Sequence, residues 1–144
     1  LCSKRPDYYE LSVKGHLFHF FYLLFSSQGT PVTFNRDKSL DKVKQIVSYI
    51  ESHYTEPITV QSTADYLGFS ESHFMRYFKE TMGTSFVDYL RDYRLTIASR
   101  LLTTSDSSIL DIAAESGFEN LSYFNRVFKQ KYSMTPRQFR KESQ

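Results

Sequence analysis

Two arginines, Arg76 and Arg126, each follow a serine at helical spacing, in stretches that also hold evenly spaced phenylalanines. Arginine can donate two hydrogen bonds to one guanine, and small polar side chains can reach other base edges in a DNA major groove. Such side chains on the outer face of a helix therefore predict hydrogen bonding to bases. The two outward sets are Ser72, Met75 and Arg76, and Ser122, Asn125 and Arg126.

The two arginines belong to two copies of one pattern. Gly68 and Gly117 are 49 residues apart, and the same offset links the residues before them; after one inserted residue the offset becomes 50. Ten paired positions with one insertion indicate two copies of one supersecondary unit. The pairs are Thr59 and Ser108, Val60 and Ile109, Ala64 and Ala113, Gly68 and Gly117, Phe69 and Phe118, Ser72 and Ser122, Phe74 and Phe124, Arg76 and Arg126, Phe78 and Phe128, and Lys79 and Lys129.

Each copy predicts two short helices joined by a tight turn. In the first copy, a helix is expected over 60–67 with Thr59 as its N-cap. Gly68 then supplies the left-handed backbone that a tight helix exit needs. Ser70 caps a second helix, expected over 71–82. The pattern therefore predicts a helix-turn-helix in each copy.

At this point the chain resembles the AraC/XylS family of transcription regulators. The resemblance covers roughly 38–141 and is most specific over 112–140, while 94–102 is similar to the family's central helix. Ser116 departs from the family, which usually has an aliphatic residue there. The resemblance implies an all-α fold, in which two helix-turn-helix subdomains are joined by a long central helix.

The resemblance also implies roles for individual side chains. The outward sets match the family's base-reading positions, and Leu121 and Tyr123 occupy neighbouring matching positions where they could contact thymine methyls or sugars. Lys79 and Lys129 are better placed for phosphates. A solvated helix surface is the alternative for any one of these residues, and the repeat disfavours it. His73 could contact DNA or merely cover Tyr77. The expected core residues are Phe74, Phe78, Phe124 and Phe128.

A strongly apolar segment, 8–25, precedes these elements and predicts an N-terminal apolar helix. Its apolar residues surround the helix, so it should be buried, either against a partner or folded back on the chain. We interpret 1–36 as the remnant of a sensor or dimerisation domain plus a linker over 26–36. His16 and His19 lie within metal-ligand reach on it, but no third ligand is near, which favours a structural role.

The remaining residues, 37–144, are expected to form the DNA-binding domain. It divides into a first helix-turn-helix unit (37–83), a central helix (84–103) and a second unit (104–144). We predict a leading helix over 40–54 and a short final helix that ends near Lys141, after a capping box. The central helix should bury one stripe: Phe86, Leu90, Tyr93, Ile97 and Leu101.

Composition agrees with this interpretation without predicting it. The net charge of +2 over 144 residues makes no case for nucleic acid, but 120–144 holds six basic residues and one acidic residue. This block coincides with the second outward helix, where phosphate contacts would be wanted. A solvated basic C-terminus is the alternative, and charge alone does not separate the two.

Other classes of protein receive little support. Cys2 is the only cysteine, so one chain can form no internal disulfide, which favours an intracellular protein. Leu17–Phe25 is too short to span a bilayer. The chain has no phosphate-binding glycine loop and no recognised pairing of nucleophile and base, so we expect no enzyme, cofactor or metal site. A helical protein-interaction module without DNA binding is the alternative that fits the same fold.

Several partners are expected. They are double-stranded DNA, RNA polymerase, a second copy of the chain through residues 8–25, and a small-molecule effector that acts only through a sensor domain not included in these residues. We expect a cytoplasmic transcription regulator, and neither activation nor repression follows from the residues.

Overall fold

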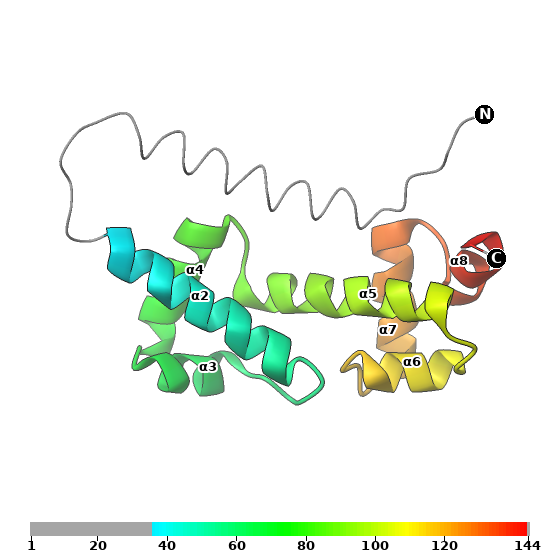
Figure 1. The fold of residues 1–144 in the computed structure, drawn as a ribbon, viewed down its shortest axis with the longest axis horizontal. Coiled ribbons are helices and arrows are strands. Elements are labelled where there is room, and N and C mark those ends of the chain that lie inside the picture. The colour runs from blue at the N-terminus through cyan, green and yellow to red at the C-terminus, as the bar shows by residue number, and fades with distance from the viewer. Residues whose placement is uncertain (1–35, 144) are drawn as a thin grey trace, which may run out of the picture. The chain divides into compact units, whose positions relative to one another are not determined.

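The computed structural model describes residues 36–143, and every regular element in that range is an α-helix (Figure 1). The chain divides into two compact units, Leu1–Lys38 and Ser39–Gln144, and the described residues lie in the second apart from Arg36–Lys38. The predicted apolar helix over 8–25 and the linker before Arg36 lie outside the described residues. The helices are α2 (Arg36–His53), α3 (Val60–Leu67), α4 (Glu71–Met82), α5 (Phe86–Thr104), α6 (Ile109–Glu115), α7 (Leu121–Tyr132) and α8 (Pro136–Ser143).

N-caps start the helices where the sequence predicts them. The side chains of the predicted caps Thr59 and Ser70, and that of Ser85 before α5, each accept a hydrogen bond from the backbone N–H three residues further on. The predicted capping box of α8 is also present: the Thr135 N–H donates to Gln138 Oε1 at 2.9 Å, and the Gln138 N–H donates to Thr135 Oγ1 at 3.3 Å. A cap of this kind typically stabilises a helix by about 1 kcal/mol, so these starts are set locally.

Two helices extend beyond their predicted ends. α2 begins at Arg36 rather than at Leu40, so the last residue of the predicted linker is helical. α5 continues to Thr104, one residue past the predicted end of the central helix at 103. The apolar stripe marks only the buried part of a helix, and no glycine or proline interrupts either polar extension, so both predicted ends fell short.

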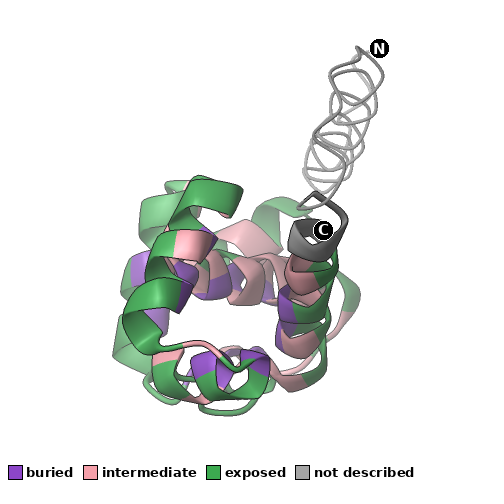
Figure 2. Cartoon of the chain, turned by 90° about the vertical axis from the view of Figure 1, so that its left-hand side faces the viewer, coloured by how far each residue is buried: buried purple, intermediate pink, exposed green. Residues whose placement is uncertain are grey.

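The helices enclose two separate cores, and buried residues line the inner sides of the helices (Figure 2). The four phenylalanines predicted for the core are each 0% exposed, which confirms that prediction. The first core consists of Ile46, Ile50, Ala64, Leu67, Phe74, Phe78, Phe86 and Leu90. The second consists of Leu95, Ala98, Leu102, Ile112, Ala113, Phe118, Phe124, Val127 and Phe128.

Helix α5 contributes to both cores, but through different faces. Its first half buries residues of the predicted stripe, whereas its second half buries Leu95, Ala98 and Leu102. Ile97 and Leu101, which the single stripe placed in the core, are only partly buried. At about 100° per residue, the two buried sets lie on nearly opposite faces of the helix. The single-stripe prediction is therefore wrong for the second half, because one helix packs on two bodies.

Candidate nucleic-acid interface

Both helix-turn-helix turns have the predicted left-handed glycine. Gly68 has φ +70° and Gly117 has φ +84°. In each turn the N–H of the following phenylalanine, Phe69 or Phe118, donates to the carbonyl of an alanine five residues earlier, at 2.9 Å. The turns therefore fold in the same way, and each directs its second helix, α4 or α7, away from the first.

The phenylalanine after each glycine holds the second helix in place. The Phe118 ring is 7% exposed and lies 5.0 Å from the Phe124 ring, measured between centroids. The Phe69 ring contacts His73 edge-on at 4.5 Å. His73 lies 6.4 Å from Tyr77, so it covers Phe69 more closely than the residue the sequence suggested.

Helix α4 places its predicted site residues on its outer face. Ser72, Met75, Arg76 and Lys79 are all exposed, and Met75 is 48% exposed although it is apolar. The opposite face of the same helix supplies two phenylalanines to the first core. The structure thus brings these four side chains together on one open helical surface.

Helix α7 presents the second set. Leu121, Ser122, Tyr123, Arg126 and Lys129 are exposed, with Leu121 at 36% and Tyr123 at 40%. The guanidinium carbon of Arg126 lies 5.3 Å from the centre of the Tyr123 ring, within the range of a cation–π contact. The remaining member of this set, Asn125, is half-buried.

Two residues of the basic C-terminal block are used in packing. The Lys131 ammonium donates to the Asp92 carbonyl on α5 at 3.0 Å, and burial lowers the pKa of Lys131 while the Asp92 charge opposes the shift. The Arg140 guanidinium donates to the Ser107 carbonyl at 2.6 Å. The block therefore offers fewer side chains to phosphate than its sequence indicates.

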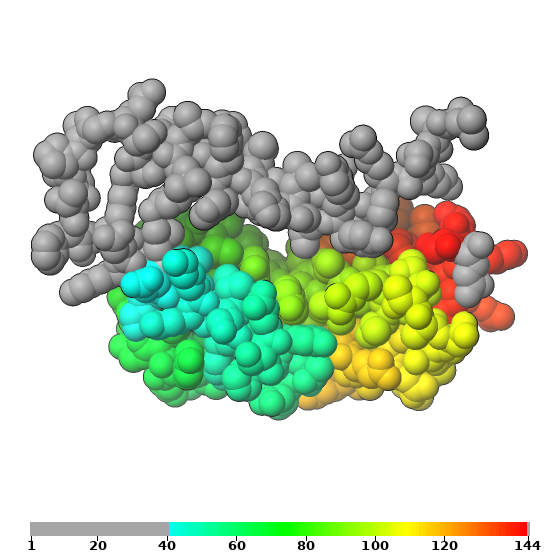
Figure 3. All heavy atoms as spheres, viewed as in Figure 1, coloured from blue at the N-terminus to red at the C-terminus, as the bar shows by residue number. Residues whose placement is uncertain are grey.

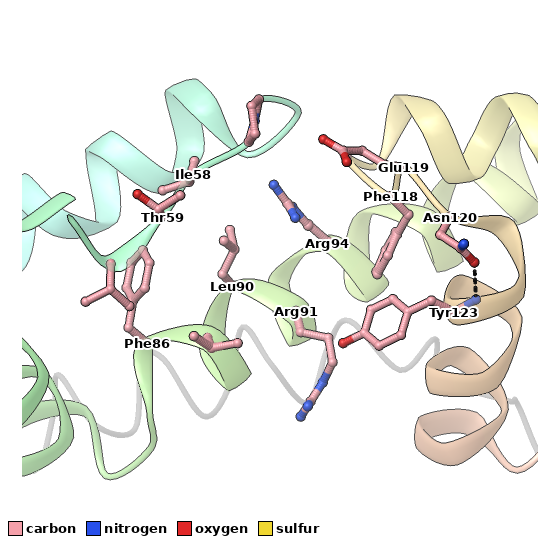
Figure 4. Close-up of a pocket in the computed structure, with 14 residues that line it drawn as sticks. Ile58, Thr59, Phe86, Leu90, Arg91, Arg94, Phe118, Glu119, Asn120 and Tyr123 are labelled. Atoms are coloured by element: carbon pink, nitrogen blue, oxygen red, sulfur yellow. Dashed lines mark hydrogen bonds between the residues drawn. The ribbon is translucent and has the colours of Figure 1, made fainter. Parts of the chain in front are cut away.

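A cleft of about 400 Å³ lies between the first and the second helix-turn-helix unit (Figure 4). Its floor is α5, including Leu90, and one wall is the Ile58–Thr59 segment before α3, which Figure 4 shows facing Phe118 and Glu119 on the other wall. Arg94 rises from the floor between the walls (Figure 4). The cleft thus lies where the two units approach each other.

Arg94 is the functional candidate that the sequence did not single out. Its Nε donates to the Tyr54 carbonyl and its Nη2 to the Glu56 carbonyl, each at 2.7 Å. Burial lowers the pKa of Arg94, and the Glu119 charge opposes that shift. These contacts could not be predicted from the sequence, because both acceptors are backbone carbonyls, which every residue has.

Within residues 36–143 no group of three or more histidine, cysteine, aspartate or glutamate side chains could hold a metal ion. His16, His19 and Cys2 lie outside the described part of the chain. No described helix combines the length and the apolar character needed to cross a membrane.

Comparison with known proteins agrees with this geometry. Residues 63–142 match the family described as "Helix-turn-helix domain". An HTH-type transcriptional regulator of Staphylococcus aureus is 37% identical over 113 residues, which cover 76% of this chain and 15% of that protein. The chain therefore spans only a small part of the curated relatives it matches.

Solved structures share the fold. The C-terminal domain of the two-component response regulator yesN from Fusobacterium nucleatum is 34% identical, with a TM-score of 0.68 over 69% of this chain and 98% of that domain. The DNA-binding domain of AdpA, solved in complex with a target DNA, is 26% identical, with a TM-score of 0.68 over 70% of this chain and 91% of that one. The matched family is one of DNA-binding regulators rather than enzymes. With two equivalent helix-turn-helix units on one central helix, the chain belongs to the AraC-type helix-turn-helix family of DNA-binding transcription regulators.

Proposed function

We propose that the chain binds double-stranded DNA at a specific bipartite site, with α4 and α7 in successive major-groove segments on one face of the duplex. The observation that carries the proposal is the equivalence of the two helices: each presents an exposed arginine and serine at matched positions. Groove-reading helices need such an outer face. The AdpA domain, which shares the fold and was solved in complex with a target DNA, supports DNA binding by this chain.

The length of α5 fits this arrangement. Its 19 residues give a helix of roughly 28 Å at ~1.5 Å per residue. Successive major-groove segments on one face are about 34 Å apart. Modest bending of the DNA can absorb the difference.

Individual side chains take two roles in the proposal. Base-reading side chains hydrogen-bond to base edges or contact thymine methyls, and the exposed lysines contact phosphates, which set position but carry no sequence information. Removal of a lysine should weaken binding to all sequences alike, and removal of an arginine should relax specificity at one base pair. The base-reading residues are Ser72, Met75, Arg76, Leu121, Ser122, Tyr123, Asn125 and Arg126, and the phosphate-contacting residues are Lys79 and Lys129.

The wider setting is also part of the proposal. We assign 37–144 to the DNA-binding domain and 1–36 to the end of a sensor or dimerisation domain, with self-association through 8–25. A small-molecule effector would act through that sensor domain, and RNA polymerase would be the partner through which transcription changes. Such a regulator works in the cytoplasm of a bacterium.

Selection of bound duplexes from a random library would identify the two half-boxes, and a five-base-pair insertion between them tests the proposal. The insertion turns one half-box to the far side of the duplex, so affinity should fall towards that of a single unit. Fluorescence anisotropy at two salt concentrations measures the loss, and the salt dependence reports the phosphate contacts. A spaced site that binds as tightly as the original contradicts the bipartite mode. If no duplex binds at low salt, the interaction-module alternative is favoured.

A further inference from the structure

We propose that Arg94 fixes the angle between the two helix-turn-helix units and thereby sets the spacing of the half-boxes that one chain can bind. The second part of this inference rests on the proposed function; the first part concerns the free protein. Arg94 is thus a positioning residue, because nothing in the proposal requires it to touch DNA.

The position of Arg94 along α5 is the first observation. The buried and partly buried residues of the first core end at Tyr93, and those of the second core begin at Leu95. Arg94 is therefore the residue at which α5 passes from one core to the other. The apolar contacts that hold each unit to α5 do not by themselves restrain bending of the helix at this junction.

The contacts of Arg94 cross that junction. Its two hydrogen bonds reach the Tyr54 and Glu56 carbonyls in the loop between α2 and α3, which belongs to the first unit. On its other side the guanidinium borders Gly117 in the turn of the second unit: a Cβ built on Gly117 would lie 2.7 Å from Arg94 Nε and would collide with the Tyr54 carbonyl oxygen. Loop, guanidinium and turn are thus in direct contact, and Figure 3 shows the blue-green loop meeting the orange turn at the bottom of that view.

Two other hydrogen bonds fasten the second unit to α5, one on each side of the junction. The Tyr132 hydroxyl donates to the Leu95 carbonyl at 3.3 Å, and the Lys131 ammonium donates to the Asp92 carbonyl. These bonds join α7 to α5 but do not reach the loop of the first unit. The hydrogen bonds of Arg94 join α5, at the junction, to the loop of the first unit. The turn of the second unit lies next to that loop. Such a planar guanidinium holds two acceptors in a fixed geometry.

The first experiment replaces Arg94 by lysine in the full 144-residue chain. Lysine keeps the charge but has a single nitrogen, so it cannot hold both carbonyls in the same planar geometry. Binding is measured to the selected site, to sites with one or two base pairs added or removed between the half-boxes, and to a site with one half-box scrambled. The wild type should favour the selected spacing about tenfold. Arg94→Lys should reduce that preference to about twofold while its affinity for the single half-box stays unchanged.

A pair of alanine variants tests the same contact without changing Arg94. Gly117→Ala places a methyl group against the Tyr54 carbonyl, whereas Gly68→Ala has the same left-handed backbone penalty and meets nothing within 4 Å. Gly117→Ala should therefore lose the spacing preference, and Gly68→Ala should retain it. This comparison also decides the question if Arg94→Lys does not fold.

A distance measurement separates the inference from the proposed function. In a Cys2→Ser background, Glu80→Cys on α4 and Gln130→Cys on α7 each carry a spin label. The two positions are equivalent and exposed, and the distance between the labels reports the separation of the helix-turn-helix units without DNA. The distance distribution should be narrow in the parent and broad in Arg94→Lys. If the parent binds no DNA but the distribution still broadens, the proposed function fails and the positioning role stands. An unchanged distribution, or an unchanged spacing preference in a folded variant, overturns the inference.

Discussion

The two helix-turn-helix units share one turn but not the surroundings of that turn. A Cβ added at Gly68 would meet nothing within 4 Å, whereas one added at Gly117 would collide with the Tyr54 carbonyl oxygen and with Arg94. Both glycines have positive φ. The first unit therefore needs glycine for its backbone conformation, and the second needs it for conformation and for space.

A second difference lies one residue before each glycine. Leu67 is 4% exposed and fills the first core. At the equivalent position Ser116 is 0% exposed, and its hydroxyl has no hydrogen-bond partner among the described residues. A buried hydroxyl without a partner costs about 1–3 kcal/mol. The second unit thus combines the tighter turn with the poorer packing around it, although the first unit has the same local fold.

Substitution of each turn glycine by valine should give the largest difference in stability between the two turns. Gly117→Val should lower the free energy of unfolding by about 4 kcal/mol or more, because strain and a collision with backbone act together. Gly68→Val should cost only about 1–2 kcal/mol, the left-handed penalty of a residue with a Cβ. Chemical denaturation followed by circular dichroism measures both values. Equal losses would mean that space around Gly117 is not limiting.

The likeness of the two units is tested on their outer faces. Arg76→Ala and Arg126→Ala should each weaken binding to the selected site by about 1–3 kcal/mol, the value of a bidentate contact to guanine. Both side chains are exposed, so thermal melting should barely change. Arg100→Ala, which removes an exposed arginine from α5, is the matched control and should leave affinity nearly unchanged. A loss of binding that only follows a loss of fold would contradict the assignment.

The poorer packing of the second unit can be improved at one position. Ser116→Ala removes the unpartnered hydroxyl and should raise the free energy of unfolding by about 1 kcal/mol. Thr63→Val is the control: Thr63 is also fully buried, but its hydroxyl donates to the Thr59 carbonyl at 2.9 Å. That variant should gain nothing. If both variants have the same effect, the missing partner of Ser116 is not the cause.

The smallest difference between the units is the residue that follows the second helix of each, α4 or α7. Gly83 follows α4 with φ +74°, and Ser133 follows α7 with φ +61° as the one non-glycine residue with positive φ among those described. Ser133→Gly should raise the melting temperature slightly, with a gain of about 0.5 kcal/mol, because glycine relieves left-handed strain but has more freedom in the unfolded chain. Gly83→Ser should lower it by a similar amount. Opposite signs from these would contradict the assignment of strain to Ser133.

Features that depend on a few neighbouring residues could be predicted from the sequence. The caps at Thr59 and Ser70 and the turn at Gly68 need only bonds that span three to five residues, so residue type and spacing were enough. The predicted site residues other than the half-buried Asn125 lie on open faces of α4 and α7, and the roles of all of them toward DNA stay predictions.

Features that depend on distant parts of the chain were not predictable in the same way. The second buried face of α5, with Leu95 and Ala98, follows from two bodies that pack on one helix, which one periodic stripe cannot express. Arg94 bonds to a carbonyl 40 residues away, and Lys131 to one 39 residues away. A charged residue that is exposed to solvent and one that bridges two backbone segments look alike in a sequence.

The sharing of α5 between two cores has a consequence for how the domain unfolds. If the second unit opened alone, Leu95, Ala98 and Leu102 would lose their cover while the first half of the same helix stayed packed. Breaking a helix at its middle leaves unsatisfied backbone groups on both sides of the break. The amide protons of α5 should therefore exchange with solvent more slowly than those of α3 and α6, and at similar rates in both halves. The two repeats would then behave as one cooperative folding unit rather than as two.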